Sequence, residues 1–100
     1  MPEKFFKVWL DEKTYITVLF ATVDGHVVSF VVRLMSATES GDKCICRYDT
    51  AHGCPHLDIV DSRGHLLEKK WLLEMSLAEA LRFAIKDLKQ NHAKYFKNFR

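Results

Sequence analysis

Apolar and polar residues alternate along the first two-thirds of the chain, which is the pattern of half-buried strands. The alternating segments are short, rich in Val, Ile, Phe, Tyr and Thr, and separated by polar turns. The predicted strands are residues 5–10, 15–22, 26–35, 43–49, 57–61 and 65–71. Since short turns join them, we expect consecutive strands to pair antiparallel.

The turns set the expected register of the strands. Asp24-Gly25 is a hairpin signal. A three-residue loop, 23–25, places Phe20 opposite Val28, whereas a two-residue loop would scatter the apolar side chains over both faces. We therefore expect the longer loop, which gathers on one face Ile16, Val18, Phe20, Val28, Phe30, Val32 and Leu34. Residues 61–64, with Asp first and Gly fourth, predict a type I turn in a second hairpin.

The last quarter of the chain has helical periodicity. Ser76 and Glu79 form a capping box, and an apolar stripe follows it: Leu81, Ile85, Leu88, His92, Tyr95 and Phe99. A helix over residues 77–97 is predicted, with Ser76 as its N-cap and the apolar stripe on the sheet. The fold class is therefore α+β: an antiparallel meander sheet of about five strands packed against one long C-terminal helix.

Composition indicates a folded domain. The chain has 100 residues, of which 48% are apolar and 28% charged, so we expect a single domain over residues 1–100. The longest apolar stretch, residues 27–35, is interrupted by Ser29 and Arg33 and is too short to cross a bilayer. The N-terminus lacks signal-peptide features, and three cysteines are an odd number for a disulfide framework. These features favour a cytoplasmic protein without membrane contact.

Charge is unevenly distributed. Six basic residues and one acidic residue follow residue 81, whereas the first 81 residues carry nine basic and twelve acidic ones. The basic excess lies on the predicted helix, and its central members, which we call the basic stripe, are Arg82, Lys86 and Lys89. A basic segment on an otherwise acidic domain indicates an anionic partner such as RNA. The alternative is a solvated helix face, which is the commoner role of such a stripe.

Reactive residues concentrate in one segment, residues 44–58, with the sequence CICRYDTAHGCPHLD. It holds all three cysteines and surrounds a loop, residues 50–55, that contains a Gly and a Pro. Strand alternation places Cys44 and Cys46 on one face, where we expect them to pack inward, and Arg47 and Asp49 on the other. Residues that follow directly on a strand end often form a binding or catalytic site.

Acid–base chemistry is one interpretation of this segment. It needs histidines held by carboxylates beside a cation, and the segment supplies His52, His56, Asp49, Asp58 and Arg47. In a metal-independent phosphodiester reaction, one histidine would accept a proton, the other would donate one, and Arg47 would neutralise the phosphate. The alternative is that one histidine caps the loop and the other is exposed.

Metal binding is a second interpretation. The potential zinc ligands are Cys44, Cys46, His52, Cys54, His56 and Asp58. Their spacing is a poor match to the paired ligands of structural zinc sites, so we expect no metal and no other cofactor. Cys54 as a nucleophile between two histidines is a third interpretation, but no cysteine-hydrolase signature accompanies it.

The motif Arg47-Tyr48-Asp49-x-x-His52-Gly53-x-x-His56-x-Asp58 resembles that of a small uncharacterised prokaryotic protein family. More loosely, it is similar to the TumE-type toxins of bacterial and archaeal toxin–antitoxin pairs. The likeness covers residues 15–90 in layout and residues 47–56 in identity. It implies interference with RNA or translation and, as a partner, a cognate antitoxin-like protein.

Two classes of function follow. The first is a small RNA-directed enzyme whose catalytic residues are Arg47, Asp49, His52, His56 and Asp58. The second is a non-catalytic module that binds a protein or a nucleic acid. For either class, we expect these five residues to converge on one solvent-accessible cleft at a strand end. For RNA, we also expect the basic stripe to share one surface with that cleft.

Overall fold

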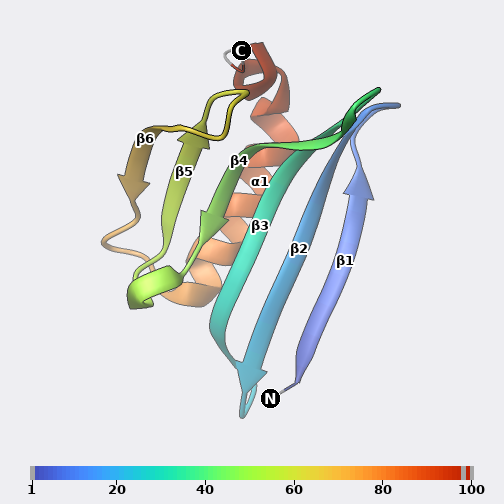
Figure 1. Ribbon diagram of the computed structural model, residues 1–100. Coiled ribbons are helices and arrows are strands. Elements are labelled where there is room, and N and C mark those ends of the chain that lie inside the picture. Colours follow the sequence, from blue (N-terminus) through green and yellow to red (C-terminus); the bar gives the residue numbers. More distant parts are fainter. Residues whose placement is uncertain (1, 98, 100) are drawn as a thin grey trace.

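The computed structural model describes residues 2–97 and 99, and of His52 the backbone but not the side chain. Six strands form one antiparallel meander in chain order: β1 Glu3–Trp9, β2 Thr14–Val23, β3 His26–Thr38, β4 Gly41–Asp49, β5 His56–Val60 and β6 Leu66–Trp71. A 3-10 turn, η1 Ala51–Gly53, joins β4 to β5, and the helix α1 Leu77–Lys97 lies behind the sheet (Figure 1). The predicted α+β class is confirmed, with six strands in place of about five.

The helix covers only one face of the sheet, which we call the inner face. Its small residues Ala80 and Ala84 are fully buried and let α1 lie close to the strands. The core beneath it comes mainly from β2, β3 and β4: Ile16, Val18, Phe30, Val32, Leu34, Ile45, Cys46 and Tyr48. The other face, which we call the open face, has no helix against it in the described chain (Figure 1).

The capping box starts α1 where the sequence predicts. The Glu79 backbone N–H donates to Ser76 Oγ at 3.1 Å, and the Ser76 N–H donates to Glu79 Oε1 at 3.0 Å. The hydrogen bond from the Ser76 N–H lowers the pKa of the Glu79 carboxyl. No helix in the described chain is both long and apolar enough to cross a membrane.

The loop between β2 and β3 is shorter than predicted. Val23 pairs directly with His26, so Asp24 and Gly25 alone form the turn, both with positive φ (51° and 79°). The apolar face survives because one extra residue of β3, Val28, bulges between the pairs Thr22–Val27 and Ala21–Ser29. The predicted register is therefore wrong: Phe20 lies opposite Phe30, and Val28 is 39% exposed.

A second bulge changes the placement of one cysteine. Leu34 pairs with Cys46 and Met35 with Cys44, which leaves Ile45 as the extra residue of β4. Ile45 and Cys46 are both buried in the core, whereas Cys44 is half-buried. Burial raises the pKa of the Cys44 thiol, and the nearby charges of Arg47 and Arg33 act in the opposite direction. Cys44 therefore lies beside the arginines, and the prediction that it packs inward is wrong.

Candidate functional site

Four of the five predicted site residues meet where β4 and β5 pair on the open face. Arg47 lies opposite Asp58, and Asp49 lies opposite His56. The loop sequence allows this return because Pro55 holds Cys54 extended and Gly53 takes a positive φ of 81°. Two pairs of opposite residues and one tight turn are thus enough to bring two carboxylates, an arginine and a histidine together.

Charge pairing holds the four side chains in one network. His56 Nε2 lies 3.0 Å from Asp49 Oδ1 and 3.5 Å from Asp58 Oδ2. Arg47 Nε lies 3.0 Å from Asp49 Oδ2, outside hydrogen-bonding geometry, and its Nη2 donates to Asp58 Oδ2 at 3.0 Å. Each carboxylate therefore contacts both Arg47 and His56.

The acidity of Asp58 reflects this network. Burial would raise the pKa of Asp58, whose side chain is 6% exposed. The hydrogen bond from Arg47 and the charges of His56 and Lys69 outweigh burial, so the pKa lies below its ordinary value. The same hydrogen bond from the Arg47 guanidinium to Asp58 raises the pKa of Arg47.

The His56 ring is enclosed by protein on all sides that its contacts define. Its Nδ1 lies 3.0 Å from the carbonyl oxygen of Cys54, which can only accept a hydrogen bond. Its Nε2 faces the Asp49 carboxylate at 3.0 Å. The His56 side chain is 2% exposed, and the Trp71 ring lies against it with centroids 5.0 Å apart. His56 is therefore closed off from solvent within the network and does not line an open cleft.

Strand β6 contributes two residues that sequence reasoning missed. Lys69 Nζ lies 3.5 Å from Asp58 Oδ1, and Trp71 covers His56. The turn at residues 61–64 forms as predicted, but by itself it would align Glu68 with Asp58. An extra residue in β6, Leu67, shifts the register by one. The sequence carries no clear signal for this bulge.

A metal ion would fit this group of ligands poorly. Among the described side chains, Asp49, His56 and Asp58 bring ligand atoms within 4.8 Å of one another. Arg47 and Lys69 already balance the two carboxylates, so a dication would add charge to a site that has no further anion in contact. Cys54 offers its carbonyl to His56 rather than its thiol to a metal. The absence of metal remains a prediction.

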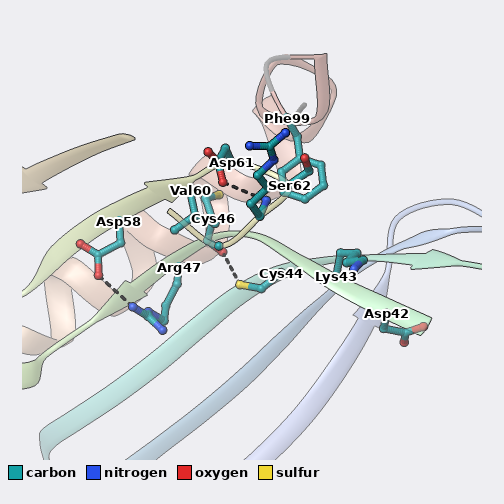
Figure 2. A pocket seen from close by; sticks show the side chains of 12 residues that line it. Asp42, Lys43, Cys44, Cys46, Arg47, Asp58, Val60, Asp61, Ser62 and Phe99 are labelled. Atoms are coloured by element: carbon teal, nitrogen blue, oxygen red, sulfur yellow. Dashed lines mark hydrogen bonds and ion pairs between the residues drawn. The ribbon is translucent and has the colours of Figure 1, made fainter. Parts of the chain in front are cut away.

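Two hollows flank the network. One, of about 400 Å³, lies where the first half of β4 separates from the β5–β6 turn, and Arg47 and Asp58 stand at its side, joined by their hydrogen bond (Figure 2). The other, of about 410 Å³, is lined by Asp49 together with apolar and small side chains of β2 and β3, among them Leu19 and Val31. The two hollows give solvent access to the margins of the network but not to the His56 ring.

The pairing of the strands aligns four cations across the open face. Partner residues at one level of all six strands are Lys7, Thr17, Arg33, Arg47, Asp58 and Lys69. We call Lys7, Arg33, Arg47 and Lys69 the cationic row. Arg33 lies directly opposite Arg47 and makes no ion pair within the described residues. Like charges placed opposite each other destabilise a sheet, so this pair is costly unless an anion binds it.

Aromatic residues border the cationic row. Trp9 and Tyr15 lie on one side, with the Lys7 ammonium 4.5 Å and 3.9 Å from their ring centroids. On the other side of the row, the next set of paired residues across the sheet begins with Phe5 on β1 and ends with Trp71 on β6. These two side chains are 63% and 46% exposed. The open face thus combines a line of positive charge with exposed aromatic rings.

The basic stripe lies elsewhere. Arg82, Lys86 and Lys89 are exposed, whereas the residues of α1 that face the sheet are Ala80, Leu81, Ala84 and Leu88. The stripe therefore lies on the side of α1 turned away from the sheet. The ion-pair network lies on the open face of the sheet, and α1 lies behind the other face (Figure 1). The expectation that stripe and cleft share one surface is wrong. The His52 side chain, a predicted catalytic group, lies outside the described residues.

A tyrosine–carboxylate cluster behind β4 was also missed by sequence reasoning. The hydroxyls of Tyr48 and Tyr95 both donate to Asp87 Oδ2 at 2.6 Å, and Asn91 donates to Asp87 Oδ1 at 2.8 Å. Burial raises the pKa of Tyr48, and the hydrogen bond to Asp87 raises it further. The cluster ties α1 to the strand that carries Arg47, and so it holds the candidate site from behind.

The fold and the site define a small α+β domain with an ion-pair network on an open sheet face. A family model described as a domain of unknown function, DUF7718, matches residues 1–100, so the chain belongs to that family. No curated protein and no solved structure matches the chain. The family agrees with the expected uncharacterised family, and no comparison points to TumE-type toxins.

Proposed function

We propose that this domain binds single-stranded RNA on its open face and is not an enzyme. The observation that carries the proposal is the cationic row, whose four members lie on β1, β3, β4 and β6 at one level of the sheet. At a strand spacing of about 4.8 Å, the row is about 24 Å long, enough for several phosphates of an extended strand. Exposed aromatic rings beside such a row are suited to stack with unpaired bases.

Arg33 is the residue in which the proposal is most easily tested. The charges of Arg47 and Lys69 are balanced by Asp49 and Asp58, whereas Arg33 makes no ion pair in the described chain. A phosphate placed against Arg33 would also relieve its repulsion from Arg47. RNA, rather than an acidic protein, is favoured by the flanking Trp9 and Trp71, whose exposed rings can stack with unpaired bases.

The geometry favours binding over catalysis because of His56. A general acid or base must come within hydrogen-bonding reach of the substrate, and both ring nitrogens of His56 already face protein oxygens. Arg47 would likewise have to leave two carboxylates before it could neutralise a reacting phosphate. In this proposal, the network acts as a fixed support that keeps Arg47 in the row.

The test is fluorescence anisotropy with a labelled 12-nucleotide RNA at low salt, in which Arg33→Gln is compared with Lys89→Gln. Both variants remove one exposed or partly exposed positive charge, but Lys89 belongs to the basic stripe. Arg33→Gln should weaken binding about tenfold and reduce the salt slope by about 0.7, as for one lost phosphate contact. Lys89→Gln should stay within about twofold.

Other results would contradict the proposal. If Lys89→Gln weakens binding and Arg33→Gln does not, the helix is the RNA surface. Undetectable binding at low salt removes RNA altogether. Cleavage of the RNA by the wild type, lost in His56→Ala, would restore the catalytic hypothesis of a toxin-like enzyme.

A further inference from the structure

Strand β1 forms an unprotected edge of the sheet (Figure 1). Every residue of β1 except Val8 is exposed, and Phe5 and Trp9 are 63% and 54% exposed. The strand contains no proline, and it pairs with β2 without a register shift. An edge that is long, regular and rich in aromatic residues pairs readily with another strand unless something blocks it.

The hydrogen bonds of β1 fix which residues face the empty side. The Pro2 carbonyl accepts from the Thr22 N–H at 3.2 Å, and the Leu10 N–H donates to the Thr14 carbonyl at 2.8 Å. Because backbone groups alternate in direction along a strand, the even-numbered residues of β1 face β2. The odd-numbered residues of β1 therefore present their N–H and C=O groups to the open edge.

We propose that two copies of this chain pair antiparallel along β1, with Phe5 of one copy opposite Phe5 of the other. A two-fold axis at Phe5 joins odd-numbered residues to odd-numbered residues, so both edges satisfy their backbone groups. The product is one continuous sheet through both copies. This inference concerns the edge of the sheet and does not depend on RNA binding.

The charges of β1 select this register. With Phe5 opposite Phe5, Glu3 of each copy lies opposite Lys7 of the other, and all these side chains point to the open face. A shift by two residues in either direction would place Phe5 opposite Glu3 or opposite Lys7 and would leave unlike charges unpaired. Opposite charges at directly paired positions stabilise a sheet, whereas like charges destabilise it.

Within the described chain, the Lys7 ammonium is held by aromatic rings rather than by a carboxylate, so its charge is available for this contact. The ammonium lies over the rings of Tyr15 and Trp9, which interact with its positive charge and accept no conventional hydrogen bond from its N–H donors. An ammonium has three N–H donors, so one can reach Glu3 of the second copy. The Phe5 rings would at the same time form a cross-strand aromatic pair.

A charge exchange tests the proposal. Sedimentation of the RNA-free protein should give a dimer of twice 11.6 kDa at high concentration. In the dimer, Lys7→Glu and Glu3→Lys each place two pairs of like charges opposite each other. Each variant should therefore raise the dissociation constant of the dimer about tenfold or more. The double variant Glu3→Lys/Lys7→Glu restores both pairs and should return within about threefold of the wild type.

Lys4→Glu is the matched control because it makes the same charge change on the same strand. Lys4 points to the other side of the sheet and would lie opposite Phe6, so it should change the dissociation constant less than about threefold. Circular dichroism checks that each variant is folded. A wild type that stays monomeric at 200 µM, or a double variant no better than the single ones, overturns the proposal.

Discussion

Asp58→Asn should reveal how much the ion-pair network contributes to stability. The substitution keeps the size and shape of the side chain and removes its charge. Asp58 accepts from Arg47 at 3.0 Å and lies 3.5 Å from both His56 and Lys69. Loss of one partner from a fully buried pair costs about 3–5 kcal/mol. The Arg47 and Lys69 side chains are 41% and 32% exposed, so water compensates them in part, and we expect about 2 kcal/mol.

The stability difference between wild type and Asp58→Asn should depend on pH. The pKa of Asp58 is lower in the folded state than its ordinary value of 3.8. The charged carboxylate therefore stabilises the fold at pH values above that ordinary pKa, and this stabilisation is lost as the pH falls through the folded-state pKa. Urea unfolding at pH 7 should therefore separate wild type from Asp58→Asn by about 2 kcal/mol. The difference should shrink progressively below pH 4, because the wild-type carboxyl then also becomes neutral.

Glu68→Gln is the control for Asp58→Asn. Glu68 pairs with Lys70 on the same strand as Lys69, but these side chains are 50% and 57% exposed. Its loss should cost less than about 0.5 kcal/mol. The reasoning fails if Asp58→Asn unfolds at the wild-type midpoint at pH 7, or if its deficit stays constant down to pH 3.

Three further predictions address other parts of the molecule. Ser76→Ala should lower the free energy of unfolding by about 1 kcal/mol, measured by chemical denaturation; an unchanged midpoint would mean that packing alone starts the helix. Tyr48→Phe should lower the free energy of unfolding by about 1–2 kcal/mol in the same denaturation experiment, since a buried donor to the Asp87 carboxylate is lost; an unchanged midpoint would refute the cluster's role. Elemental analysis of protein purified without chelators should find no stoichiometric metal; one zinc per chain that is lost in Cys54→Ser or His56→Ala would contradict this.

Local signals in the sequence were sufficient for the elements of the fold. The capping box at Ser76, the type I turn at residues 61–64 and the period-two alternation each act within a few residues, and the structure contains all three. The meeting of Arg47, Asp49, His56 and Asp58 was also predictable, because one tight turn returns the chain beside itself.

Bulges account for most of what the sequence did not reveal. An inserted residue reverses the side chains that follow it, and nothing local distinguishes Val28, Ile45 or Leu67 from ordinary strand residues. The bulges at Val28 and Ile45 keep apolar residues of β3 and β4 in the core, so they become visible only when both strands and the helix are placed. Leu67 lies in β6, whose residues are all exposed, so burial does not explain that bulge. The burial of His56 likewise depends on a residue distant in sequence, since Trp71 at the end of the next strand, β6, lies against its ring.

The positions of the two tryptophans give the chain a built-in optical probe of one surface. Trp9 and Trp71 are the only tryptophans, they lie near opposite ends of the open face, and both are about half-exposed. Their emission responds to whatever covers that face, whether a ligand lies along the row or a second copy adjoins β1. A molecule held by the basic stripe, on the far side of α1, leaves both rings in their original surroundings. Unlabelled protein can therefore report which of its two basic surfaces is occupied.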